Sequence, residues 1–149
     1  MTNDAMEDVT LPRAKTGFTR FLPSIARVLL GLVFLVFGAN GFFHFIPQPE
    51  MKMSEKATAF ITGLMGTGYM EQLMSGTQVI VGILLLTNCF VPLALALIAP
   101  FIVNVFAFHA FLEHSGIVIA IVISLLEIYL AWAYRNAFRP MLKLKTIPS

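Results

Sequence analysis

Four long apolar runs, almost free of charged residues, constrain this chain more than any other feature of its sequence. A helix needs about 20 apolar residues to cross the roughly 30 Å hydrocarbon layer of a lipid bilayer. The four runs reach this length and cover residues 21–46, 70–90, 92–112 and 116–134. The sequence therefore predicts an all-α integral membrane protein, built as a bundle of four transmembrane helices.

The charged residues lie mostly outside these runs. They make up only 12% of the chain, whereas an average soluble domain contains about a quarter. A chain of 149 residues has room for one such bundle and no second domain. The net charge of +2 is too small to suggest a nucleic-acid partner. We expect a disordered cytoplasmic tail over residues 1–17, the transmembrane domain over 18–142, and a second cytoplasmic tail over 143–149.

A segment between the first two runs is too polar to be a fifth span. Residues 50–69 begin with two glutamates and two lysines, and Ser54 can cap a helix there. The apolar residues that follow recur at helical spacing and form one stripe: Ala57, Phe60, Ile61, Leu64, Met65 and Gly68. This pattern predicts a short amphipathic helix that lies on the membrane surface or against the bundle.

The distribution of Lys and Arg predicts the orientation, because these residues are retained on the cytoplasmic side. The loop after the third run contains neither. Basic residues precede or open the first run and follow the fourth: Arg13, Lys15, Arg20, Arg27, Arg135, Arg139, Lys143 and Lys145. We therefore expect both ends of the chain on the cytoplasmic side, and an even number of spans agrees with this because it places both ends on the same side.

Short links and small residues predict close packing between neighbouring helices. The links at residues 88–91 and 113–115 are so short that the helices they join must be antiparallel neighbours. Gly31, Gly38 and Gly82 lie within the runs and permit close helix contact.

Two charged residues lie at membrane depth, where charges are costly. Arg27 lies six residues into the first run from its cytoplasmic end, and Glu127 lies seven residues from the same end of the fourth. At about 1.5 Å per residue, both lie roughly 10 Å deep. We therefore predict a buried ion pair that holds the helices in register. Proton transfer by Glu127 is a second reading, and the absence of any pair is a third.

A second polar group gathers toward the predicted outer face and forms the candidate ligand site. Asn40 and His44 are four residues apart, as are His109 and Glu113, so each pair shares a helix face. The full set of candidates is Asn40, His44, Gln78, Asn104, His109, Glu113 and His114. These side chains could hydrogen-bond a quinone or another small ligand, or shuttle protons. Alternatively, they serve only as hydrogen bonds between helices.

The sequence argues against a metal or haem site and against an internal thiol relay. It contains no H-x-x-x-H or E-x-x-H motif, and its histidines occupy separate turns. Cys89 is the only cysteine, so neither an internal disulfide nor a C-x-x-C pair can form. Any redox role would need a cofactor supplied from elsewhere.

Several short motifs resemble those of the DoxX family of small bacterial membrane proteins. They are RVLLG at 27–31, GANG at 38–41, FHFIP at 43–47, TGYM at 67–70, FVPLAL at 90–95, APFIVN at 99–104 and EIYLAW at 127–132. The resemblance covers about residues 24–142. It implies four helices in the bacterial inner membrane and an association with quinone-linked thiosulfate oxidation or with oxidative-stress complexes. It implies no catalytic residues, and a shared fold does not establish an activity.

Three functions fit these observations. The first is a small inner-membrane subunit or partner of a redox or oxidative-stress complex, not a self-sufficient enzyme, that binds a quinone-like ligand near the outer face. The second is a small-solute transporter, which with four spans would have to act as a homo-oligomer or carry a very small substrate. The third is a non-enzymatic scaffold that recruits proteins through the basic segment 135–145.

Overall fold

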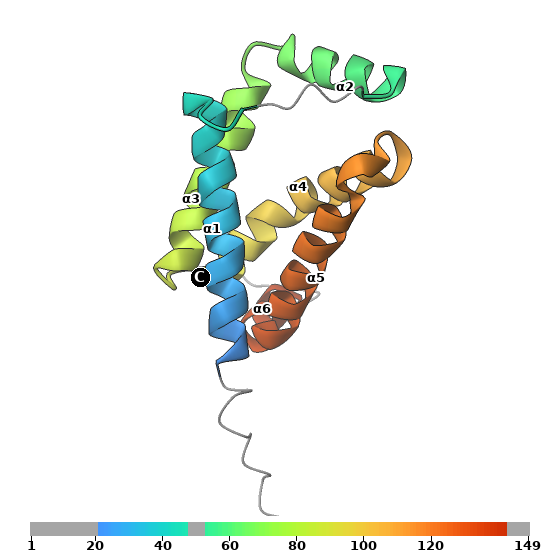
Figure 1. Ribbon diagram of the computed structural model, residues 1–149. Helices are drawn as coiled ribbons and strands as arrows, with labels where there is room; N and C mark the ends of the chain where they lie inside the picture. The colour runs from blue at the N-terminus through green and yellow to red at the C-terminus, as the bar shows by residue number, and fades with distance from the viewer. Residues whose placement is uncertain (1–20, 48–52, 143–149) are drawn as a thin grey trace, which may run out of the picture.

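The computed structural model describes residues 21–47 and 53–142, and all regular structure within them is helical (Figure 1). The predicted tails at 1–17 and 143–149 lie outside the described residues. The helices are α1 Leu22–Phe43, α2 Glu55–Met65, α3 Met70–Leu86, α4 Val91–Phe111, α5 Ile117–Ala133 and α6 Arg135–Phe138, with 3₁₀ turns η1 at His114–Gly116 and η2 at Arg139–Leu142.

Three segments are individually long and apolar enough to cross a membrane: α1, α4, and η1 together with α5. Helix α3 has 17 residues, or about 25 Å at roughly 1.5 Å per residue, and is slightly short. It reaches the length of a membrane-spanning segment only together with α2, from which it is bent by 86°. Because α3 runs alongside α1 (Figure 1), it is the fourth helix of the bundle. The protein is thus a small multi-pass membrane protein.

Helix α2 confirms the prediction of a short helix between the first two spans. Ser54 caps it, because the Oγ atom of Ser54 accepts a hydrogen bond from the backbone N–H of Ala57 at 3.2 Å. The turn between α2 and α3 contains Gly68 at a φ of 76°, a left-handed conformation that glycine adopts without strain. The sharp bend lets α2 lie across one end of the bundle (Figure 1).

Helices α1 and α3 pack closely because glycines line their contact. A Cβ atom added at Gly38 would lie 2.8 Å from the backbone nitrogen of Val79, and one at Gly82 would lie 2.7 Å from that of Leu35. Such distances leave room for hydrogen but not for a side chain, as in other close membrane helix contacts. The close contact expected from these glycines is therefore confirmed.

The buried core lies toward the end of the bundle where α1 begins and α5 finishes, here called the terminal end. Leu30 of α1, Leu85 of α3, Leu95 of α4 and Leu130 of α5 are fully buried there. Toward the opposite end, which α2 covers, α4 and α5 lean away from α1 and α3 (Figure 1). The four helices are therefore joined mainly at the terminal end.

The outward faces of the spans are apolar, as contact with bilayer lipid requires. Val103 is 68% exposed and Ile128 is 64% exposed, although both are large hydrophobic residues. At the terminal end, Trp132 is exposed and the Arg135 guanidinium carbon lies 4.8 Å from the centre of its ring. Such Trp and Arg residues commonly occupy the membrane–water interface.

Candidate functional site

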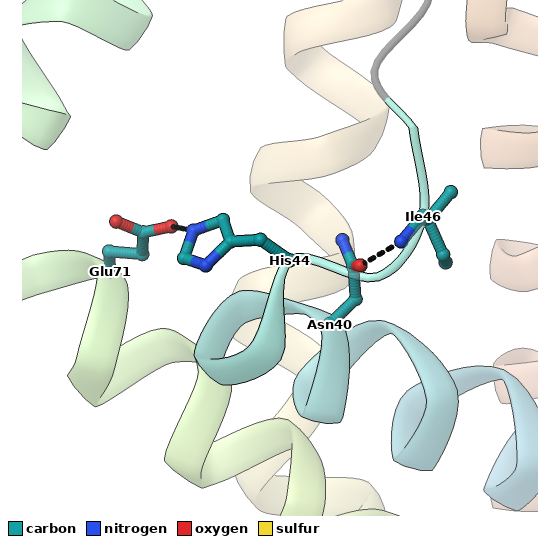
Figure 2. A network of polar contacts seen from close by, with 4 residues as sticks. All are labelled: Asn40, His44, Ile46 and Glu71. Carbon is teal, nitrogen blue, oxygen red and sulfur yellow. Dashed lines mark hydrogen bonds and ion pairs between the residues drawn. The ribbon is translucent and has the colours of Figure 1, made fainter.

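The first predicted polar pair lies where α1 ends (Figure 2). Asn40 is buried, and its Oδ1 atom accepts a hydrogen bond from the backbone N–H of Ile46 at 2.7 Å. His44 has a φ of 49°, which ends the helix, and its Nε2 atom lies 3.3 Å from Oε1 of Glu71. Asn40 therefore supplies a hydrogen-bond acceptor to the backbone just beyond the end of α1. His44 joins α1 to the first turn of α3. Sequence reasoning assigned Glu71 no role here.

The second predicted pair joins α2 to the end of α4, through contacts here called the α2 clasp. The Oε2 atom of Glu113 accepts a hydrogen bond from the backbone N–H of Ser54 at 3.0 Å, and the Ser54 hydroxyl donates to the carbonyl of Leu112 at 2.6 Å. The Nδ1 atom of His109 lies 2.9 Å from the carbonyl oxygen of Glu113. The backbone N–H of Ser54, more than any other group, lowers the pKa of Glu113 below its ordinary value.

The other three candidates lie apart from these two groups. Gln78 is buried in the α1–α3 contact beside Gly38, whereas His114 is exposed in η1. Asn104 is exposed and lines a groove of about 260 Å³ beneath α2, together with Phe60 and Phe108. The seven predicted residues therefore do not line one common pocket. Their spacing predicted their level along the helices, but not the direction in which each side chain points.

The predicted ion pair between Arg27 and Glu127 is not formed, although the structure describes both residues. Instead, the Nη1 atom of Arg27 donates to the backbone carbonyls of Leu85 and Leu86. These carbonyls lie in the last turn of α3, where helical carbonyls lack intrahelical partners and the helix end carries partial negative charge. Arg27 therefore caps α3. The depths of Arg27 and Glu127 could match without their side chains facing each other.

Glu127 instead lines a groove of about 540 Å³ between α4 and α5. Glu127 is only 7% exposed, and its buried Oε2 atom has no hydrogen-bond partner among the described residues. The groove is lined by Ala99, Ile102, Val103 and Phe106 of α4 and by Ile121, Ser124, Leu125, Glu127, Ile128 and Ala131 of α5. Glu127 and Ser124 are the polar side chains in this set.

Helical spacing builds this groove, and the sequence carries its signal. Ser124 and Ala131 are three and four residues from Glu127, and Ile121 and Ile128 are three and four residues from Ser124. Residues at such spacings share one side of a helix. Listing the neighbours of Glu127 by helical period would therefore have identified the α5 wall, but not the α4 residues that face it.

No family model, curated protein or solved structure matches this chain. The site must therefore be interpreted from its own chemistry. Within residues 21–47 and 53–142 there is no cluster of three or more His, Cys, Asp or Glu side chains that could hold a metal ion. What the groove offers is an apolar surface with the buried Glu127 carboxyl group in its wall, an arrangement suited to binding an apolar molecule.

Proposed function

We propose that this protein binds a lipid-soluble, quinone-like small molecule in the α4–α5 groove and works as a partner or small subunit of a membrane redox complex. The observation that carries the proposal is the Glu127 carboxyl group, which is buried in the wall of an apolar groove with Oε2 unpartnered. A buried polar group without a partner is costly. Ionisable residues retained inside membrane segments commonly mark functional sites.

The surroundings of the groove support a ligand that arrives from the bilayer. Val103, Leu125 and Ile128 line the groove and are also exposed on the outward face of the helices. A molecule dissolved in lipid could therefore enter sideways without passing through water. The volume of about 540 Å³ lies within the range of about 300–1,000 Å³ that is common for small-molecule sites.

The redox part of the proposal is supported by the sequence. Short motifs over residues 24–142 resemble the DoxX family, which is associated with quinone-linked oxidation. The single cysteine cannot form an internal disulfide, so electrons would pass between the bound molecule and a redox centre on a partner protein.

The same reasoning supports a bacterial inner-membrane location with the terminal end of the bundle on the cytoplasmic side. The basic residues Arg135 and Arg139 follow α5 at this end, as the retention of basic residues in the cytoplasm requires. Helix α2 and its clasp would then lie on the outer side. The sequence also allows an oligomeric transporter or a non-enzymatic scaffold. No contact in the groove favours either of these two functions.

A binding measurement in lipid nanodiscs tests the proposal. Decylubiquinone is titrated into the full chain, and quenching of Trp132 is recorded, because this residue is the sole tryptophan and follows the groove residue Ala131. Empty nanodiscs correct for partition into lipid. We expect saturable binding to the unaltered protein.

Two matched variants locate the site. Ala99→Phe places a ring in the groove and should abolish saturation. Ala96→Phe makes the same change one turn earlier on α4, at an exposed residue outside the groove lining, and should bind normally. Absence of saturable binding, or equal binding to both variants, would refute the proposed site.

A further inference from the structure

A patch of positive charge lies at the terminal end of the bundle, where the chain leaves α5. Residues 128–149 contain four basic residues and no acidic one. Two of the basic residues, Arg135 and Arg139, lie in the described part of the chain, and both are exposed. They are called here the arginine pair. Neither arginine lines the groove or takes part in the α2 clasp.

The two members of the arginine pair are neighbours on one helical face. The helical backbone of α6 continues through Arg139, which has a φ of −53° and a ψ of −42°. Arg135 and Arg139 are four residues apart, a spacing at which side chains lie side by side and like charges repel each other. Among the residues that the structure describes, the one ion pair joins His44 to Glu71. The arginine pair therefore brings two positive charges together without a carboxylate partner from the described chain.

Arg135 is held in a fixed place by Trp132. Its guanidinium carbon lies 4.8 Å from the centre of the Trp132 ring, within the range of a cation–π contact. Its Nη1 atom also donates a hydrogen bond to the backbone carbonyl of Trp132 at 3.1 Å. This bond occupies one of the several N–H groups of a guanidinium, so the others can bind an anion. The planar arrangement of these donors fits the oxygens of a phosphate group.

The packing around α6 places the arginine pair at the membrane surface. Tyr134 and Phe138 pack against the buried core, so α6 is fixed at the end of α5 (Figure 1). Trp132, in the last turn of α5, is 62% exposed, and exposed tryptophans at the end of a span commonly lie at the level of the lipid headgroups. The arginine pair follows this residue directly and therefore lies where lipid phosphates are the nearest anions.

From these observations we infer that the arginine pair binds the headgroup of an anionic phospholipid. The headgroup phosphate supplies the missing counter-charge, and the acyl chains of the same lipid lie against the exposed ring of Trp132. This contact with an apolar ring favours a lipid over a soluble protein as the partner of the basic segment. Basic residues beside a membrane helix attract anionic lipids in general. The inference goes beyond the proposed function and does not depend on the α4–α5 groove.

Quenching of Trp132 by brominated lipid tests the inference, because Trp132 is the sole tryptophan and reports the lipids beside it. The full chain is reconstituted in bilayers of phosphatidylcholine with brominated acyl chains. Unbrominated phosphatidylglycerol or unbrominated phosphatidylcholine then replaces part of the quencher. Each basic residue near an anionic surface contributes roughly fivefold to binding, so the pair should favour phosphatidylglycerol by up to roughly 25-fold. The preference should weaken as salt is added, because salt screens exposed charges.

Variants of the arginine pair locate the lipid. Arg139→Gln removes one charge at an exposed position and should lower the preference by roughly fivefold, whereas Arg139→Lys keeps the charge and should retain most of it. Arg135→Gln should also lower the preference, with its fluorescence normalised to bilayers without bromine because the substitution changes the surroundings of Trp132. Lys56→Gln is the matched control: it removes an exposed charge in α2, at the other end of the bundle, and should change nothing.

Three results would overturn the inference. The first is equal displacement of the quencher by the two unbrominated lipids, which would leave the basic segment to a protein partner. The second is a preference that persists in both Arg135→Gln and Arg139→Gln, which would place the lipid elsewhere. The third is a preference that disappears when inorganic phosphate replaces chloride at the same ionic strength, which would show that the pair binds free phosphate and not a lipid headgroup.

Discussion

Replacement of Gly82 by alanine should weaken the α1–α3 contact, which is the most extensive helix contact among the described residues. The new Cβ atom would lie 2.7 Å from the backbone nitrogen of Leu35 and 2.9 Å from its Cα atom. Ordinary contact begins near 3.4 Å, so α1 must retreat by roughly 0.7 Å, because backbone atoms cannot rotate away as a side chain would. A gap of about 0.5–1 Å removes a quarter to a half of the dispersion energy of each affected contact.

The expected cost follows from this displacement. Overpacking of a close contact typically lowers the unfolding free energy by about 1–3 kcal/mol. The better helix propensity of alanine offsets this by up to about 1 kcal/mol. We therefore expect the variant to lose about 1–2 kcal/mol of unfolding free energy. The measurement is reversible unfolding in mixed detergent and SDS micelles, followed by helical circular dichroism.

Gly63 provides the matched control. It also lies inside a helix, but a Cβ atom added there would meet nothing within 4 Å. Gly63→Ala should therefore be neutral or stabilise the protein by up to about 1 kcal/mol. If the two alanine variants unfold at the same SDS fraction, the glycine contact does not limit the approach of α1 and α3, and the packing argument is wrong.

Three further predictions concern the charged residues and the orientation. Arg27→Met keeps the apolar stem but removes the cap of α3, so the unfolding free energy in the same SDS assay should fall by about 1–3 kcal/mol. The α2 clasp should stay intact at any pH above the ordinary glutamate pKa of about 4.3 and should loosen as the pH falls through the lowered pKa of Glu113. Hydrogen exchange of the α2 amides measures this loosening. Glu113→Gln should remove its pH dependence. Cys89 is exposed in the link between α3 and α4, so in intact cells a membrane-permeant maleimide should label it and an impermeant one should not; labelling by both would reverse the proposed orientation.

The fold could largely be predicted because its signals are local. Apolar run length determines whether a helix can span the bilayer, and the runs expected at 21–46 and 92–112 correspond to α1 and α4. The cap at Ser54 and the apolar stripe after it likewise indicated α2. The predicted extent of the second span was the least accurate, since α3 ends at Leu86, several residues before its expected end at residue 90.

The candidate site was harder to predict because it depends on direction as well as depth. Asn40 and His44 were expected either to face a ligand or to hydrogen-bond between helices; in the structure Asn40 bonds the backbone just beyond α1, and His44 contacts Glu71 of α3. His109 and Glu113 were expected in the same pocket, yet they hold α2 in place. Asn40, His109 and Glu113 each bond a backbone group near a helix end, where such groups lack helical partners.

The amino-acid sequence by itself determined that the chain is helical, that it crosses the membrane several times and that a short helix follows the first span, because hydrocarbon length and helix capping depend on neighbouring residues. Only the tertiary structure decided that Arg27 caps α3 and that Glu127 lines a groove with α4. Two residues at equal depth can face different neighbours, since the rotation of each helix about its axis is set by packing, here by the close α1–α3 contact at Gly38 and Gly82.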